Sequence, residues 1–345
     1  MSTHTIVITG GLGNLGSKLC HHLLNLNKNQ SSSSTTTTKY KVILIEHPNF
    51  INPDKNKPLQ NDENVTVLPC NLGNPTAEQR TSLKKALVGA HALIHFSAVN
   101  PYPNANWSES AQSMDHAFYI FQLAVLCKVR RVILASSNHV MGGYKDLSTH
   151  GPSSIHPTSP PRVGTIPLNP AQIASSGDAI AYGTAKLAAE RLAMTLGELY
   201  GDVTSFVVLR IGWCQPGENL PSTLSAAGSP PEFLADGGEV VVEEASEDDK
   251  KDELWYKGMW LSNRDFLGYF GAAIDLVVPT TEEEAALKGG DNVTTDDEIS
   301  STGVHRNVRK GFVLVNAMSK NSGAKWNLEE TEKRLGVVSK DDSMA

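Results

Sequence analysis

The 345-residue sequence has no apolar run long enough to cross a bilayer, and its first residues, MSTHTIVITG, lack the basic segment and long apolar stretch of a signal peptide. We therefore expect a cytoplasmic protein with no membrane partner. Basic residues are outnumbered, because 30 Lys and Arg stand against 37 Asp and Glu, for a formal net charge of −7. A negative protein repels phosphate backbones, so we expect no nucleic-acid partner.

Cysteine is scarce as well. Cys20, Cys70, Cys127 and Cys214 lie far apart, with no close pair and no histidine at the spacing of a metal site. We expect reduced, buried thiols in a reducing compartment, and no metal ion.

Short apolar strand patterns alternate with amphipathic helix patterns through the first 212 residues. The strand patterns cover 5–10, 40–46, 64–72, 91–99, 129–137 and 203–212, and the helix patterns cover 14–26, 76–90, 108–128 and 178–201. Such alternation predicts an α/β fold, a doubly wound parallel sheet of the Rossmann type with helices on both faces. The polar low-complexity tract at 27–39 is typical of a loop inserted between a helix and a strand.

The pattern weakens beyond residue 212. A Pro/Gly/Ser-rich segment at 216–231 and an acidic run at 243–253 are typical of solvated loops. Helix patterns at 261–278 and 326–336, with a strand pattern at 311–319, follow. We expect a Rossmann domain at 1–212 and a smaller C-terminal substrate-binding lobe at 213–345 that carries the acidic and proline-rich insertion.

A dinucleotide site is indicated by Gly10, Gly13 and Gly16 in TGGLGNLG, which separates the first strand from the first helix. Glycines there allow a tight turn and bring helix-end amides to a pyrophosphate. Glu46 ends the second strand, where a carboxylate binds the ribose and repels a 2′-phosphate, so we expect NAD rather than NADP. Glu46 could instead be a solvated strand end. The remaining expected cofactor contacts are Asn14, Leu15, Asn71, Leu72, Phe96 and Ser97.

Catalysis is indicated by Tyr182 and Lys186 in AYGTAKLAAER. Residues four apart share one helix face, and an ammonium beside a cationic nicotinamide ring favours the phenolate of the tyrosine. Ser136 and Ser137, at the end of a strand, could hold the substrate oxygen. Each residue also has a structural explanation: Tyr182 as a buried helix residue, Lys186 as a surface residue and the serines as a helix cap or loop. Their joint order after a glycine-rich turn favours a catalytic role.

The strings TGGLGNLG, HFSAV, ASSNHVMGGY, YGTAK and LRIG together resemble the extended short-chain dehydrogenase/reductase superfamily, in its NAD-dependent epimerase/dehydratase group. Within that group, the sequence looks most like uronate dehydrogenases and related aldose dehydrogenases, through the strings SSNHVMG, MWLSNRDF and WNLEETEKRLG. The resemblance implies that Ser137 binds the reacting hydroxyl and that Tyr182 removes its proton. Lys186 would bind the nicotinamide ribose and lower the pKa of Tyr182, while Asn138 and His139 contact the sugar.

The resemblance also implies that a hydride passes from the anomeric carbon to NAD, which gives a lactone and NADH. It implies a possible homodimer as well, since dimers are common in that family. Three positions differ from uronate dehydrogenases: Ser113 replaces an asparagine of the proton relay, Trp213 replaces a serine, and Lys257 is the nearest cation to the place of a carboxylate-binding arginine. The sequence therefore leaves open whether the substrate is acidic. Two alternatives also stay open, a nucleotide-sugar epimerase or dehydratase and a catalytically silent NAD-binding regulator.

Overall fold

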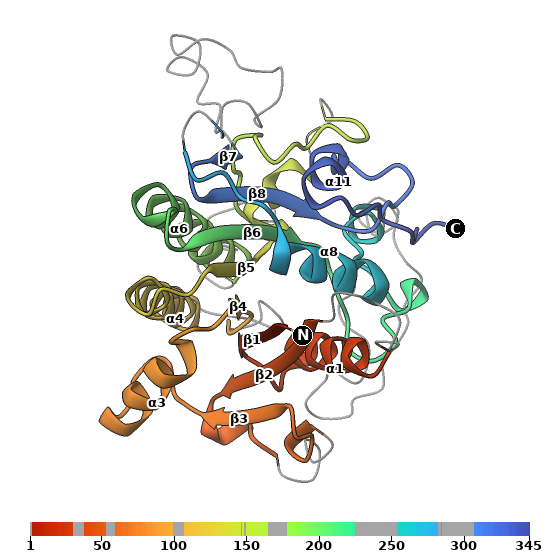
Figure 1. Ribbon diagram of the computed structural model, residues 1–345. Coiled ribbons are helices and arrows are strands. Elements are labelled where there is room, and N and C mark those ends of the chain that lie inside the picture. Colours follow the sequence, from red (N-terminus) through yellow and green to blue (C-terminus); the bar gives the residue numbers. More distant parts are fainter. Residues whose placement is uncertain are drawn as a thin grey trace.

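A computed structural model describes residues 2–29, 38–52, 59–98, 107–145, 147, 150–164, 178–224, 254–281, 284 and 307–345. Its centre is one eight-stranded sheet in the order β3-β2-β1-β4-β5-β6-β8-β7 (Figure 1). Neighbouring strands are parallel except β7 and β8, which are antiparallel. The strands are β1 (Ser2–Thr9), β2 (Thr38–Glu46), β3 (Val65–Pro69), β4 (Ala92–His95), β5 (Arg131–Ser137), β6 (Ser205–Ile211), β7 (Val308–Arg309) and β8 (Phe312–Ala317).

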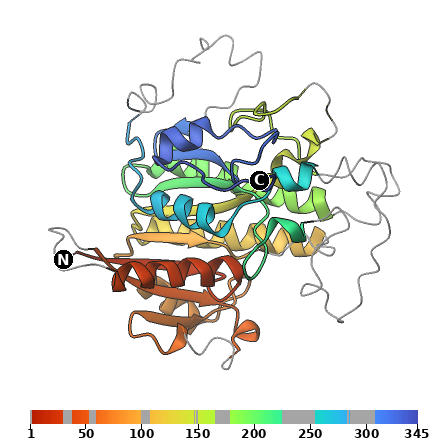
Figure 2. The same ribbon diagram turned by 90° about the vertical axis from the view of Figure 1, so that its right-hand side faces the viewer.

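Helices cover both faces of the sheet. The helices are α1 (Asn14–Lys28), α3 (Ala77–Leu87), α4 (Trp107–Leu126), α6 (Asp178–Tyr200), α8 (Asn263–Asp275) and α11 (Glu329–Leu335), with short 3-10 helices η1 (Pro48–Phe50), η2 (Asn138–Tyr144) and η3 (Pro221–Thr223). Helices α1 and α8 lie on one face, and α3, α4 and α6 lie on the other (Figures 1 and 2).

The inner parts of the strands are mostly apolar because both of their faces are buried there. In β1, Ile6 and Ile8 pack toward α1 and α8, whereas Val7 packs toward α3, α4 and α6. All three side chains are fully buried. The predicted doubly wound α/β fold is therefore confirmed, with each predicted strand and helix present in the described residues.

Residues beyond 212 add to this same sheet. Strand β8 pairs with β6 from Phe206 to Ile211, and α8 packs on the face that α1 covers. The division into a domain at 1–212 and a smaller lobe at 213–345 stays a prediction. Most of the polar tract (30–37) and the whole acidic run lie outside the described residues.

The C-terminal tail is fastened to the start of α8 by one buried carboxylate. Asp265 Oδ2 accepts hydrogen bonds from the hydroxyls of Ser319 and Ser339, each at 2.6 Å, and Oδ1 accepts one from the backbone of Lys340 at 2.9 Å. The backbone of Asp341 also donates to Oδ2, at 3.2 Å, so this buried carboxylate has four donors and is well satisfied. The tail therefore fixes the N-terminal end of α8.

All four cysteines are free thiols, with Cys20 and Cys70 buried and Cys127 and Cys214 partly buried. Across the described residues, no helix combines the length and apolar character that crossing a membrane requires.

Candidate active site

The glycine loop follows β1 at the carboxyl edge of the sheet. Gly10 has a φ of +64°, which only glycine adopts freely, and a Cβ there would lie 3.1 Å from the backbone nitrogen of Ser97. A Cβ on Gly16 would lie 2.4 Å from the carbonyl oxygen of Gly10, so α1 packs too tightly on the loop for any side chain. The strand order reverses between β1 and β4, and ligands of such sheets bind in the crevice at that point.

The first turn of α1 has features that suit an anion. Gly13 caps the helix without a side-chain hydrogen bond, and the first turn contains no acidic residue. Free amides and the helix dipole at such an end favour a phosphate. Leu15, which we predicted as a cofactor contact, packs its side chain against the core, so only its backbone could serve that role.

Asn14 and Lys18 hold the segment after β6 against α1. Asn14 Nδ2 donates to the carbonyl of Cys214 at 3.0 Å. Lys18 Nζ donates to the carbonyl of Gln215 at 2.6 Å and to Asn263 Oδ1 at 2.7 Å. Lys18 was not predicted, although it lies one turn after Asn14 on the same helix face.

Glu46 lies at the glycine loop, as its position at the end of β2 predicts. Its Oε2 accepts a hydrogen bond from the backbone of Leu12 at 3.1 Å, and its Oε1 accepts one from the backbone of His47 at 2.9 Å. The carboxylate is thus oriented by the loop that it would serve. Ribose binding by Glu46 stays a prediction.

The next two predicted contacts follow β3. Asn71 Oδ1 accepts hydrogen bonds from the backbone of Gly73 at 3.0 Å and Asn74 at 3.3 Å, so its amide shapes the turn. Leu72 is buried in the core beneath α3 and α4. Its side chain therefore supports the crevice from below, and any contact with adenine would fall to the backbone.

Phe96 and Ser97 follow β4. The ring of Phe96 packs on Phe270 of α8, with centroids 5.0 Å apart, and so belongs to the core. Ser97 lies beside Gly10, and its hydroxyl is 3.5 Å from His116 Nδ1 on α4. His116 was not predicted, and no spacing in the sequence links it to this edge.

Ser137, Asn138, His139 and Tyr182 meet at the end of β5. Ser137 Oγ accepts a hydrogen bond from the backbone of His139 at 3.1 Å and lies 3.3 Å from both Asn138 Oδ1 and His139 Nδ1. The ring of His139 stands edge-on to Tyr182, with centroids 5.5 Å apart, and Tyr182 is hydrogen-bonded to Ser137. Ser137 therefore both caps η2 and contacts the tyrosine.

Lys186 lies one helical turn beyond Tyr182 and is almost completely buried. Its Nζ donates to the carbonyl of Ala135 at 2.8 Å and lies 5.6 Å from the centroid of the Tyr182 ring. Burial lowers the pKa of Lys186 from its ordinary value of 10.5 to about 8, against the opposing charge of Glu190.

Burial also favours the neutral forms of the other two titratable groups. It raises the pKa of Tyr182 to about 12, although the hydrogen bond to Ser137 acts in the opposite direction, and it lowers the pKa of His139 to about 4. The expected lowering of the tyrosine pKa is thus not a property of these side chains alone. It would need the positive nicotinamide ring as well.

A buried ion pair lies directly behind Lys186. Arg210 on β6 donates to Glu190 on α6 through Nε at 2.9 Å and through Nη2 at 2.8 Å, and the two side chains are only 2% and 4% exposed. Ser136 Oγ donates to the same carboxylate at 2.6 Å. Of the two candidate serines, Ser136 therefore faces the ion pair and Ser137 faces the tyrosine.

Trp213 and Lys257 are two of the positions at which the sequence differs from uronate dehydrogenases. The backbone nitrogen of Trp213 donates to the carbonyl of Met259 at 2.8 Å, and the Trp213 ring stands edge-on to Tyr256 with centroids 5.9 Å apart. Met259 Sδ also contacts the amide of Asn138. Lys257 precedes Met259 by two residues and is partly buried. The segment with Trp213 and Met259 thus reaches the catalytic edge through Asn138.

Ser113 lies on α4 and is buried. Its hydroxyl donates to the carbonyl of Glu109 on the same helix at 3.4 Å. A role for Ser113 in a proton relay stays a prediction.

The fold and the glycine loop define an α/β protein that binds a dinucleotide at the carboxyl edge of its sheet. Residues 6–213 match the NAD dependent epimerase/dehydratase family, and the chain belongs to that family. It is accordingly an NAD-dependent enzyme of the extended short-chain dehydrogenase/reductase type. No curated protein sequence matches the chain.

Solved structures with the same fold include two uronate dehydrogenases. A mutated uronate dehydrogenase has a TM-score of 0.57 at 18% identity, over 99% of this chain and 83% of its own. A tyrosine-to-alanine mutant of uronate dehydrogenase from Agrobacterium tumefaciens, in complex with NAD, has a TM-score of 0.53 at 17% identity, over 99% and 87%. The Bordetella bronchiseptica enzyme WbmG, with NAD and UDP, has a TM-score of 0.54 at 16% identity, over 98% and 90%. At these identities the likeness defines the fold.

Replacing Glu190→Gln should destabilise the protein strongly, because the variant leaves the Arg210 guanidinium buried without its counter-charge. We expect a loss of about 3–5 kcal/mol in the free energy of unfolding, measured by urea denaturation. The matched control is Glu198→Gln on the same helix, whose partner is Arg309 and whose side chain is 34% exposed. Its loss should stay below about 1 kcal/mol. Equal losses in the two variants would contradict a special role for the buried pair.

Lys186 should make the protein more stable as the pH rises from about 8 to its ordinary pKa of 10.5. In that window the unfolded chain keeps the lysine proton and the folded chain has released it. The unfolded state therefore binds more protons, and stability increases with pH. Urea unfolding of the wild type and of Lys186→Met, with reductant, isolates this contribution, because other groups titrate equally in both. The unfolding free energy of the wild type, minus that of Lys186→Met, should increase as the pH rises through this window. Parallel profiles would mean that the lysine is not desolvated.

Proposed function

We propose that the protein oxidises a hydroxyl group of a sugar or sugar acid with NAD as the hydride acceptor. The observation that carries this proposal is the convergence of Ser137, His139, Tyr182 and Lys186 at one strand end, with hydrogen-bond or ring contacts among them. This strand, β5, neighbours β4 at the strand-order reversal, where the glycine loop lies. A regulator that only binds NAD would have no need for a buried, desolvated lysine beneath a tyrosine.

Each side chain has a definite part in the reaction. Ser137 Oγ holds the oxygen of the substrate hydroxyl, and Tyr182 Oη removes the hydroxyl proton. NAD, when bound, supplies the electrophilic ring that receives the hydride from the carbon bearing that oxygen. Lys186 remains close to the tyrosine ring as an ammonium, and its charge, with that of the ring of NAD, favours the phenolate. His139 stays neutral, and its ring fixes one side of Tyr182.

Residues of this chain fit NAD at three points. The loop at Gly10 and Gly16 leaves no room for side chains, and the first turn of α1 presents amides without an acidic neighbour. Glu46 is oriented by the loop through Leu12. These features suit a pyrophosphate and an unphosphorylated adenosine ribose.

The sugar assignment is supported by the names of similar structures, which include uronate dehydrogenases. Trp213 and Tyr256 add an aromatic surface to the segment that touches Asn138 through Met259. A substrate carboxylate would need a cationic partner, for which Lys257 is the candidate. A cytoplasmic location and a homodimer stay predictions.

A nucleotide-sugar epimerase or dehydratase is the second candidate, since the family includes such enzymes and WbmG was solved with NAD and UDP. Such an enzyme restores its cofactor in each turnover. It also needs cations for a nucleoside diphosphate, and arginines are few after residue 212: Arg264, Arg306, Arg309 and Arg334. Arg264, Arg309 and Arg334 are engaged by carboxylates.

Absorbance of NADH separates these functions. The purified protein, supplied with NAD, is offered neutral aldoses, uronates and nucleoside diphosphate sugars in turn. Steady accumulation of NADH with a free sugar supports the proposal, whereas product without net NADH indicates the epimerase. NAD binding with no turnover of any compound would contradict the proposal.

Tyr182→Phe should lower turnover by about 10²–10⁴-fold while NAD affinity, measured by calorimetry, stays nearly unchanged.

Replacing Glu46→Ala should weaken NAD and reduce the preference for NAD over NADP. The change removes both a ribose acceptor and the negative charge that repels a 2′-phosphate. Dissociation constants for both dinucleotides, measured on the cofactor-free protein, test this prediction without a substrate. An unchanged ratio would mean that another residue contacts the ribose.

A further inference from the structure

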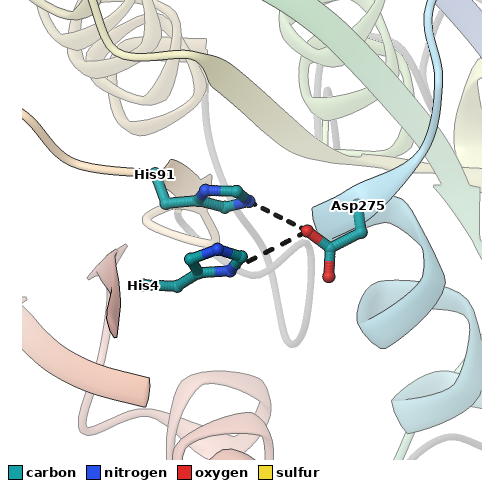
Figure 3. A group of neighbouring side chains, drawn as sticks. All are labelled: His4, His91 and Asp275. Carbon is teal, nitrogen blue, oxygen red and sulfur yellow. Dashed lines mark hydrogen bonds and ion pairs between the residues drawn. The ribbon is translucent and has the colours of Figure 1, made fainter. Parts of the chain in front are cut away.

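A group of two histidines and one aspartate lies at the amino edge of the sheet, opposite the catalytic edge (Figure 3). His4 is on β1, His91 immediately precedes β4, and Asp275 is the last residue of α8. The proposed function uses none of these residues.

The three side chains point toward one another. His91 Nε2 is 2.9 Å and His4 Nδ1 is 3.9 Å from the same oxygen, Oδ1 of Asp275 (Figure 3). One ligand atom from each of the three residues lies within 4.8 Å of the other two. The two imidazole rings are stacked, with centroids 3.5 Å apart and an angle of 11° between their planes.

His4 Nδ1 is buried and lacks a hydrogen-bond partner in the described part of the chain. A buried polar atom without a partner destabilises a protein by about 1–3 kcal/mol, so such atoms call for an explanation. This nitrogen faces a carboxylate and a second imidazole, and both are groups that can bind a metal ion.

We propose that His4, His91 and Asp275 bind a divalent transition-metal ion of the Zn²⁺ type. Two imidazole nitrogens and one carboxylate oxygen are a ligand set that this ion accepts. Ligands about 2.0–2.1 Å from a tetrahedral ion lie roughly 3.3 Å apart. The observed 2.9 and 3.9 Å lie on either side of that value, but the two rings are stacked with their planes 11° apart, so both must turn for their lone pairs to converge on one ion.

The backbone around the site is held in place. The amide of His91 donates to the carbonyl of Thr5 at 2.8 Å, which ties β4 to β1. Arg131 Nη1 donates to the carbonyls of Ala273 and Ile274, at 3.2 and 3.1 Å, and so fixes the end of α8. Because Asp275 is 53% exposed, an ion can enter from solvent and keep water as a further ligand.

Two features of the surroundings act in opposite directions. The hydrogen bond between His91 Nε2 and Asp275 Oδ1, at 2.9 Å, already brings two of the proposed ligands together. The guanidinium groups of Arg130 and Arg131 lie near enough to interact with His91 and Asp275 respectively, and they oppose a cation. Arg130 is exposed, so its charge can be removed without disturbing the core.

The ion would connect β1, the start of β4 and the end of α8, which are far apart in the sequence. A ligand that binds only the folded state stabilises it, so Zn²⁺ should raise the melting temperature of the full-length protein. Zinc binding is measured by competition with a chromogenic chelator, after removal of metal with EDTA and with reductant present. We expect one Zn²⁺ per chain at this site.

Matched variants identify the ligands. Asp275→Asn and His91→Ala should each weaken Zn²⁺ binding by at least about tenfold and remove the rise in melting temperature. His21→Ala, which changes an exposed histidine on α1, should leave both unchanged. Arg130→Gln should tighten binding, because it removes a repelling charge.

Circular dichroism of each variant verifies the fold. Because Asp275→Asn keeps the size of an exposed side chain, a loss of Zn²⁺ binding in this variant can be distinguished from misfolding. Wild-type protein that binds no Zn²⁺ would overturn the proposal. Binding that is equally strong in wild type and in Asp275→Asn and His91→Ala would also overturn it, by assigning the ion to other residues such as the cysteines.

Discussion

A buried ion pair between Glu190 and Arg210 holds the catalytic helix to the sheet. Strand register places Arg210 beside Ser136, and Glu190 binds both of them, so one carboxylate joins α6 to β5 and β6. Burial of two charges is unfavourable unless the geometry satisfies them. Here the contact is bidentate, Ser136 adds a third donor, and the carbonyl of Pro157 accepts from the other arm of the arginine at 3.2 Å. Tyr182 therefore stands at a fixed distance from Ser137.

The same carboxylate also affects the chemistry. Burial drives Tyr182, Lys186 and His139 toward their neutral forms, and Glu190 is the group that opposes this for Lys186. One turn of helix separates the two side chains, which is close enough for the charges to interact. The ion pair thus has two consequences, a fixed helix and an ammonium that stays charged at neutral pH. Burial raises the pKa of Tyr182, so the proposed role of this tyrosine as a base depends on the bound cofactor.

Local patterns predicted most of the fold, since strands buried on both faces are mostly apolar and helices show their own period. The two-residue strand β7 is too short for any period to reveal. Family motifs indicated Ser137, Tyr182 and Lys186, whose catalytic roles stay predictions, and Glu190 had a signal in its spacing of four from Lys186. Arg210 had none, because its pairing depends on the register of β5 with β6. Leu72 and Phe96 follow strands as predicted, and their side chains pack in or against the core, so their contacts with the cofactor stay predictions that fall to the backbone.

Helix α8 connects the two edges of the sheet. Near its start, Asn263 accepts a hydrogen bond from Lys18 beside the glycine loop, and its last residue, Asp275, meets His4 and His91 at the amino edge. Thirteen residues of helix span about 20 Å, so an ion at the far end acts on the catalytic edge only through the position of α8. Asp265 already fixes the near end by accepting hydrogen bonds from the tail. Metal binding should therefore affect the stability of the fold much more than the rate of hydride transfer.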